Sequence, residues 1–183
     1  MTNPLNAAAE RLEGVQALDL PARTIGTLVR RAIPPGPAKT ALSGAWLGHA
    51  LHPLLTDVPI GTFTSAVLLD LLGGRGSEDS ADKLIALGIV SVPGVVATGW
   101  SDWADEEARS PAIRRAGVVH AVLNVASVGM MGASLLARRG GDRARGKALA
   151  LAGMGVMGSA GWLGGHLSYT KGSRVEPEPS PAL

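Results

Sequence analysis

The sequence predicts an all-α integral membrane protein: a four-helix up-down-up-down bundle preceded by an amphipathic helix. Two observations carry this prediction. Charged residues make up 17% of the 183 residues, against about 25% in ordinary soluble proteins. The charges are also segregated, because three long segments contain none and a fourth contains only Asp57. These segments are residues 42–69, 84–101, 116–137 and 148–170.

Each segment is close to the length of roughly 20 residues that a helix needs to cross the hydrocarbon core of a membrane. The segments are too long and too few for a membrane β-barrel. A soluble glycine-rich bundle is the alternative, but uncharged apolar runs of this length are typical of membrane helices. We expect membrane spans at about 53–72, 84–101, 117–137 and 148–169, joined by short loops that make sequential helices antiparallel.

Apolar side chains ahead of the first span recur at helical spacing, opposite three arginines. They are Ile25, Leu28, Val29 and Ile33, facing away from Arg23, Arg30 and Arg31. This pattern is typical of a helix in the membrane interface, and also of an amphipathic helix packed on its own protein. We divide the chain into an N-terminal interfacial segment (1–41), a transmembrane domain (42–170) and a disordered C-terminal tail (171–183).

All four histidines fall at one end of the predicted bundle. In an antiparallel bundle, the starts of the first and third spans share a membrane face with the ends of the second and fourth spans. The residues of this layer are His49, His52, Asp57, Trp100, Asp102, His120 and His166. Polar side chains inside a membrane are costly and mark candidate functional sites. The layer is therefore the predicted site.

Two polar stripes at helical spacing are expected to face the bundle interior. His120 and Asn124 lie one turn apart on the third span, and Trp162 and His166 lie one turn apart on the fourth. Glycines and alanines around these residues leave room for a flat cofactor.

Imidazoles and carboxylates at one depth suit several chemistries. A haem b needs axial ligands from opposite sides, and His120 with His166 form the expected pair, near Asn124 and Trp162. His49 and His52 are then further ligands or partners of the haem propionates. A zinc, iron or copper ion is the second option. Its ligands would come from His49, His52, Asp57, His120 and His166, with Asp102 and Trp100 around them.

Other interpretations stay open. Histidine and aspartate can transfer protons or contact a quinone without a metal, and interfacial histidines can simply cap helices. A metal-dependent hydrolase is disfavoured because the chain has no recognisable metalloprotease motif. Absence of cysteine excludes disulfides and thiolate-held iron–sulfur clusters within the chain. Nothing in the charge pattern points to nucleic-acid binding.

Four stretches of the sequence are too distinctive to be generic. They are Leu-Ser-Gly-Ala-Trp-Leu-Gly-His-Ala-Leu-His-Pro-Leu-Leu-Thr-Asp-Val-Pro-Ile-Gly (42–61), Gly-Trp-Ser-Asp-Trp (99–103), Val-His-Ala-Val-Leu-Asn (119–124) and Gly-Gly-His-Leu-Ser-Tyr (164–169). Together they resemble the bacterial predicted-membrane-protein family catalogued as domain of unknown function 2231. The resemblance implies a bacterial cytoplasmic (inner) membrane location. Residue by residue, it implies a role for His49, His52, Asp57, Asp102, His120, Asn124 and His166.

Some proteins similar to this family carry a Rieske-type iron–sulfur domain after the last helix, which implies electron transfer. Because this chain lacks cysteine, such a redox partner, iron–sulfur or quinone-linked, would be a separate protein. We therefore expect a membrane protein that binds haem b or another metal and serves as an electron-transfer or accessory subunit, rather than a stand-alone enzyme. The alternative is a non-catalytic subunit that stabilises a larger membrane complex. The basic segment 138–147 is expected on the cytoplasmic side.

Overall fold

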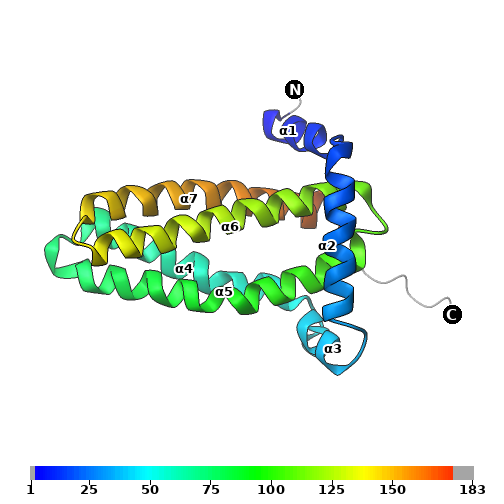
Figure 1. Cartoon of the computed structure of the whole chain (residues 1–183), viewed down its shortest axis with the longest axis horizontal. Helices are drawn as coiled ribbons and strands as arrows, with labels where there is room; N and C mark the ends of the chain where they lie inside the picture. The colour runs from blue at the N-terminus through cyan, green and yellow to red at the C-terminus, as the bar shows by residue number, and fades with distance from the viewer. Residues whose placement is uncertain (1–2, 175–183) are drawn as a thin grey trace.

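The computed structural model describes residues 3–174, which contain seven α-helices and an all-helical fold. Four long antiparallel helices form a bundle (Figure 1). Each is long and apolar enough to cross a membrane, which confirms the predicted class. The helices are α1 (Pro4–Glu13), α2 (Asp19–Ala32), α3 (Pro37–Ser43), α4 (Leu51–Leu72), α5 (Glu78–Glu106), α6 (Pro111–Arg139) and α7 (Arg143–Gly165).

Polar residues cap the starts of α6 and α7, ahead of the uncharged segments of these two helices. The Ser110 hydroxyl accepts a hydrogen bond from the Ile113 amide at the start of α6, 3.3 Å away, and Pro111 follows the cap. The Asp142 carboxylate accepts one from the Arg145 amide at the start of α7, at 3.1 Å. Both are common N-cap arrangements. At its other end, α7 runs on into a π-helical turn, His166–Thr170.

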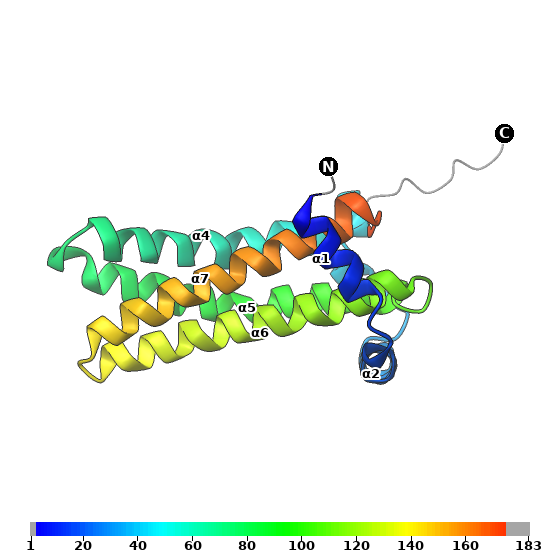
Figure 2. The ribbon, with the colours of Figure 1, turned by 90° about the horizontal axis from the view of Figure 1, so that it is seen from above.

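The bundle is built from two equivalent hairpins, because α4 packs mainly on α5 and α6 packs mainly on α7 (Figure 2). Several buried residues of α4 have a buried counterpart on α6 at the same separation along the sequence, which is the separation between Phe63 and Met131. Buried positions of α5 recur on α7 at a second constant offset, the offset between Gly88 and Gly153. The matching buried pairs are Pro59/Ser127, Phe63/Met131, Ala66/Ser134, Val67/Leu135, Ala81/Gly146, Ile85/Ala150, Gly88/Gly153 and Thr98/Leu163.

Equivalent positions also have equivalent contacts. A Cβ on Gly88 would collide with the ring of Phe63, and one on Gly153 would lie within 3.3 Å of the Met131 side chain. In both hairpins a glycine of the second helix thus makes room for a large side chain of the first. The structure therefore has an approximate internal twofold symmetry that relates α4 to α6 and α5 to α7.

A buried ionic cluster joins the two hairpins at the end of the bundle farthest from α2. The side chain of Arg138 is 0% exposed and forms a two-pronged pair with Asp70, whose side chain is 4% exposed. Arg138 also bonds Asp82, at 3.2 Å, and Arg143 contacts the same Asp82. Asp70 and Arg138 are equivalent positions of α4 and α6, so the internal symmetry brings opposite charges together.

We expect Arg138→Met to be strongly destabilising, because it leaves the buried carboxylate of Asp70 without its partner. Removing one member of a buried pair typically costs about 3–5 kcal/mol. Unfolding of the detergent-solubilised protein in increasing SDS, followed by circular dichroism, measures this cost. The neighbouring Arg139 is exposed, so Arg139→Met is the matched control and should unfold like the wild type. Equal effects of the two substitutions would show that the cluster does not hold the hairpins together.

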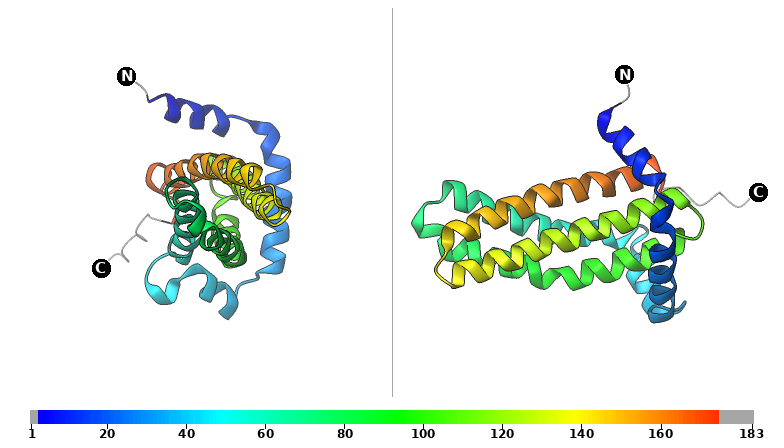
Figure 3. Two further views of the ribbon diagram at one scale, coloured as in Figure 1. Left: turned by 90° about the vertical axis from the view of Figure 1, so that its left-hand side faces the viewer. Right: turned by 45° about the horizontal axis from the view of Figure 1, so that its top comes forward.

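The N-terminal helices form a cap at the other end of the bundle. There α2 lies roughly perpendicular to the bundle axis, beside the ends of α5 and α6 (Figure 3). In a membrane-spanning bundle this direction is parallel to the membrane surface, as expected of the predicted interfacial helix. The helix packs through Ala22 and Gly26, and a Cβ on Gly26 would collide with Glu107. Of the predicted apolar face, Leu28 is 57% exposed and remains available to lipid.

Ion pairs attach this cap to the bundle. Asp19 of α2 bonds Arg115 of α6 through two carboxylate–guanidinium contacts, at 2.9 and 2.8 Å, and lies 3.3 Å from Arg114. Glu107 is buried between Arg114 and Arg30 of α2, with the Arg30 contact at 2.6 Å. Hydrogen bonds from Arg115 and Arg114 hold the pKa of Asp19 well below its ordinary value, at about 2.

Docking of α2 should therefore depend on pH in the acid range. A carboxyl whose folded pKa is lowered stabilises the docked state fully above its ordinary pKa of 3.8, and this contribution is lost as the pH falls towards about 2. Because the chain has no cysteine, spin labels on Thr24→Cys and Arg109→Cys can report the distance between α2 and the bundle. We expect a single short distance at pH 5 and a broader distribution at pH 2. In Asp19→Asn the distance distribution should change less between pH 5 and pH 2, because the carboxyl that titrates towards this acid range has been removed. An unchanged wild-type distance at pH 2 would contradict the assigned role of Asp19.

The last described residues return to the bundle end. Arg174 bonds Asp102 of α5 at 2.5 Å, and its amide donates to Glu106 at 3.0 Å. Arg174 of the predicted tail thus contacts α5, whereas residues 175–183 lie outside the described part of the chain.

Candidate functional site

The histidine layer lies at the capped end of the bundle, as the antiparallel topology requires. The four histidines are nevertheless held in different ways, and within residues 3–174 no three His, Asp or Glu side chains gather closely enough to hold a metal ion. His52 and His120 share one geometry, His166 has another, and His49 is exposed.

His52 is in the first turn of α4 and leans on α5. Its Nδ1 lies 3.0 Å from the backbone oxygen of Val95 and 3.3 Å from the hydroxyl of Thr98. Because a carbonyl can only accept, Nδ1 carries the proton and donates it to Val95. The ring lies against Gly99, where a Cβ would come within 2.7 Å of the imidazole Cε1. Glycine at this position is thus a steric requirement for the histidine.

His120 of α6 leans on α7 in the same way. Its Nδ1 lies 2.9 Å from the backbone oxygen of Ala160. The ring lies against Gly164, where a Cβ would come within 2.9 Å of the imidazole Cε1. In both hairpins the accepting carbonyl lies one helical turn before the glycine that contacts the ring, so the two sites are built alike.

The two imidazoles occupy equivalent positions under the internal symmetry, because His52 and His120 are separated by the same offset that relates Phe63 to Met131. Both rings are half-buried. Because each Nδ1–H is bonded to a backbone carbonyl, the lone pair of each ring lies on Nε2. A metal-ligating histidine is commonly oriented in this way.

Asn124 is the immediate neighbour of His120. Its side-chain nitrogen lies 3.1 Å from Nε2 of His120 and 2.9 Å from the His120 backbone oxygen. The amide thus donates one hydrogen to each acceptor, which agrees with a lone pair on Nε2. A ligand that takes this lone pair would replace the hydrogen bond from Asn124.

His166 contacts none of these groups and instead joins α7 to α1. Its Nε2 lies 2.8 Å from a carboxylate oxygen of Glu13, and Lys171 bonds the other oxygen, also at 2.8 Å. The imidazole stacks on Trp162 with ring centres 5.6 Å apart. Burial raises the pKa of Glu13, but the hydrogen bonds from Lys171 and His166 outweigh it and hold this pKa below its ordinary value. Glu13 is therefore an ionised acceptor at neutral pH.

The other predicted residues lie around this layer. Trp100 packs edge-on against Trp103 with ring centres 5.2 Å apart, and the indole of Trp103 donates to the Ile113 backbone oxygen at 3.3 Å. Asp102 is buried and bonds Arg174. It therefore has a cationic partner rather than a histidine.

Two predicted ligands lie on the outside. His49 is exposed, and its Nδ1 lies 3.0 Å from the backbone oxygen of Ala50. Asp57 is exposed on the outer side of α4. The structure therefore does not bring either side chain to the paired imidazoles.

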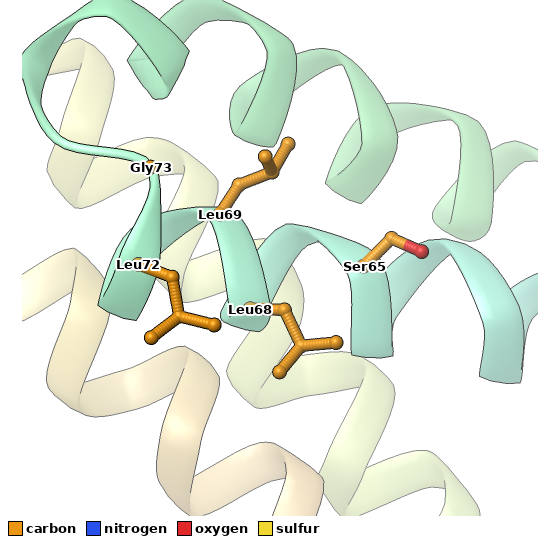
Figure 4. Close-up of a pocket in the computed structure, with 5 residues that line it drawn as sticks. All are labelled: Ser65, Leu68, Leu69, Leu72 and Gly73. Carbon is orange, nitrogen blue, oxygen red and sulfur yellow. The ribbon is translucent and has the colours of Figure 1, made fainter.

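An apolar pocket on α4 has no connection with the histidines. It is an open apolar groove of about 380 Å³ at the far end of α4 (Figure 4). Its lining residues are Ser65, Leu68, Leu69, Leu72 and Gly73. A second pocket, of about 270 Å³, does reach the histidine layer and is lined by Asn6, Trp162, Gly165, His166 and Thr170.

Sequence reasoning missed several residues that shape the site. Gly99 and Gly164 were indistinguishable from other helix glycines, and only the contacts reveal their role. Glu13 was unassigned because it belongs to a helix far from α7 in the sequence. An alignment of the first hairpin with the second, helix against equivalent helix, would have matched His52 with His120 and Gly99 with Gly164.

Comparison with known proteins agrees with this architecture. A family model described as "Predicted membrane protein (DUF2231)" matches residues 48–177, which include all four bundle helices. No curated protein and no solved structure matches the chain. The family match covers well over half of the sequence and all four histidines. The chain therefore belongs to the DUF2231 family of predicted membrane proteins.

Proposed function

We propose that this membrane protein binds one haem b, with His52 and His120 as the axial ligands. The proposal is carried by one observation: the internal symmetry gives two imidazoles the same carbonyl-bonded tautomer, at equivalent positions of α4 and α6 and at the same end of the bundle. The sequence favoured His120 with His166. Because Nε2 of His166 is held by Glu13, the contacts support His52 as the partner instead.

The number of available ligands favours haem over a bare metal ion. Zinc and similar ions are usually held by three or four protein groups, and no such group forms within residues 3–174. A porphyrin provides four nitrogen ligands itself, so that two imidazoles complete the coordination of its iron. Paired histidines on separate helices of a bundle are suited to this arrangement.

The chain's own residues would hold and orient the ligands. The carbonyls of Val95 and Ala160 keep both imidazoles in the Nδ1–H form. Gly99 lets the His52 ring lie close to α5, which removes freedom from that side chain. When bound, the haem would supply one-electron transfer.

We further propose that the protein is an electron-transfer or accessory subunit of a redox complex in the bacterial inner membrane. One site near one face cannot carry electrons across the whole bilayer. A separate iron–sulfur or quinone-linked protein would therefore complete the path. We place the opposite end on the cytoplasmic side, because Arg139 and Arg145 are exposed there and basic residues favour that side.

An absorption spectrum of the purified protein tests the haem. We expect a Soret band that shifts on reduction with dithionite, together with about one iron per chain. The band should be lost in His52→Ala and in His120→Ala, because each removes one axial ligand. His49→Ala is the matched control and should retain the full band, since His49 is exposed.

Two results would refute the proposal. One is a colourless wild-type protein that contains no iron after expression with added haem precursor. The other is a normal spectrum in both alanine variants. Loss of the band in His120→Ala and His166→Ala, with the band retained in His52→Ala, would restore the His120–His166 pair that the sequence favoured.

A further inference from the structure

The pocket at the junction of α1 and α7 is separate from the paired imidazoles. Its volume is about 270 Å³, which is enough for one six-membered ring with small substituents. Its walls combine the aromatic side chains of Trp162 and His166 with the polar residues Asn6 and Thr170. It lies at the capped end of the bundle, where the membrane surface is expected.

His166 gives this pocket a specific hydrogen-bonding character. The side chain of His166 is only 3% exposed, and its Nδ1 is buried without a hydrogen-bond partner among the described residues. Nε2 donates to the ionised Glu13, so in the imidazole form of the ring the lone pair lies on Nδ1, which can then only accept. A buried acceptor of this kind is costly when unsatisfied. The group that satisfies it must be a donor such as a hydroxyl.

A track of glycines leads from the pocket along the outer side of α7. Gly155, Gly158 and Gly161 are exposed, and a Cβ on any of them would meet nothing within 4 Å. Gly158 lies one turn before Trp162, so the track is continuous with the pocket wall. Because these glycines have no side chains, a long apolar chain can lie directly against the helix there, within the membrane.

We propose that this pocket binds the head group of an isoprenoid quinol. The quinol hydroxyl donates to Nδ1 of His166, the ring packs beside Trp162, and the isoprenoid tail lies along the glycine track. Glu13 holds the imidazole in the tautomer that can accept this hydrogen bond. The inference does not depend on the haem, because it uses neither His52 nor His120.

Binding of two quinols to the full chain in detergent, measured by isothermal titration calorimetry under argon, tests the proposal. Duroquinol has the ring without a tail, and ubiquinol-2 has a short isoprenoid tail. His166→Phe keeps an aromatic ring beside Trp162 but removes the acceptor, and it should weaken binding of both quinols about tenfold. Gly158→Leu should weaken ubiquinol-2 alone, because only the tail reaches the track.

His49→Phe is the matched control and should bind both quinols like the wild type, because His49 is exposed and does not line the pocket. Circular dichroism verifies that each variant is folded. If His166→Phe loses its fold, Glu13→Gln provides the second test, since a neutral amide no longer fixes the tautomer and should also weaken both quinols. The proposal is overturned if the wild type binds neither quinol. It is also overturned if the folded His166→Phe binds both unchanged, or if phosphatidylglycerol binds at the pocket and the quinols do not.

Discussion

In each hairpin, an imidazole donates from Nδ1 to a backbone carbonyl of the next helix while its ring lies on a glycine one turn later. A helical carbonyl already accepts a backbone hydrogen bond, so it offers its second lone pair to the histidine. The glycine lets the helices approach closely enough for this contact. The contact therefore fixes the spacing of the hairpin, the tautomer of the histidine and the availability of Nε2 together. The function we propose depends on all three.

The two ends of the bundle have different roles that follow from their polar groups. At the far end, Asp70 and Arg138 occupy equivalent positions and neutralise each other, which closes the interface between the hairpins. At the capped end, the equivalent positions hold His52 and His120, which cannot neutralise each other and instead present two lone pairs. The internal symmetry therefore places an ion pair between the hairpins at the far end and a pair of candidate ligands at the capped end. The helix α2, attached through Asp19 and Glu107, covers the side of that second end.

Much of the fold could be predicted because long uncharged segments have one stable arrangement in a membrane, a helix with its backbone hydrogen bonds satisfied internally. The histidine layer followed from the alternating direction of short-looped helices. The partners within the layer could not be predicted, because side chains one turn apart on a helix share a face only approximately. His166 was expected to face His120, but it follows so soon after Gly164 that it points to another side of α7, towards α1. The ion pairs of Arg138 and Arg114 were also hidden, since charged residues beyond the apolar segments gave no sign of burial.

We propose that one haem iron is held by two imidazoles from different helices. Low-temperature electron paramagnetic resonance of the oxidised protein, purified with its haem, tests this most directly, because the spin state of ferric iron reports its axial ligands. We expect a low-spin ferric signal of bis-imidazole type in the wild type, and loss of this signal in His52→Ala. A high-spin wild-type signal, or a low-spin signal that survives in His52→Ala, would contradict the proposal.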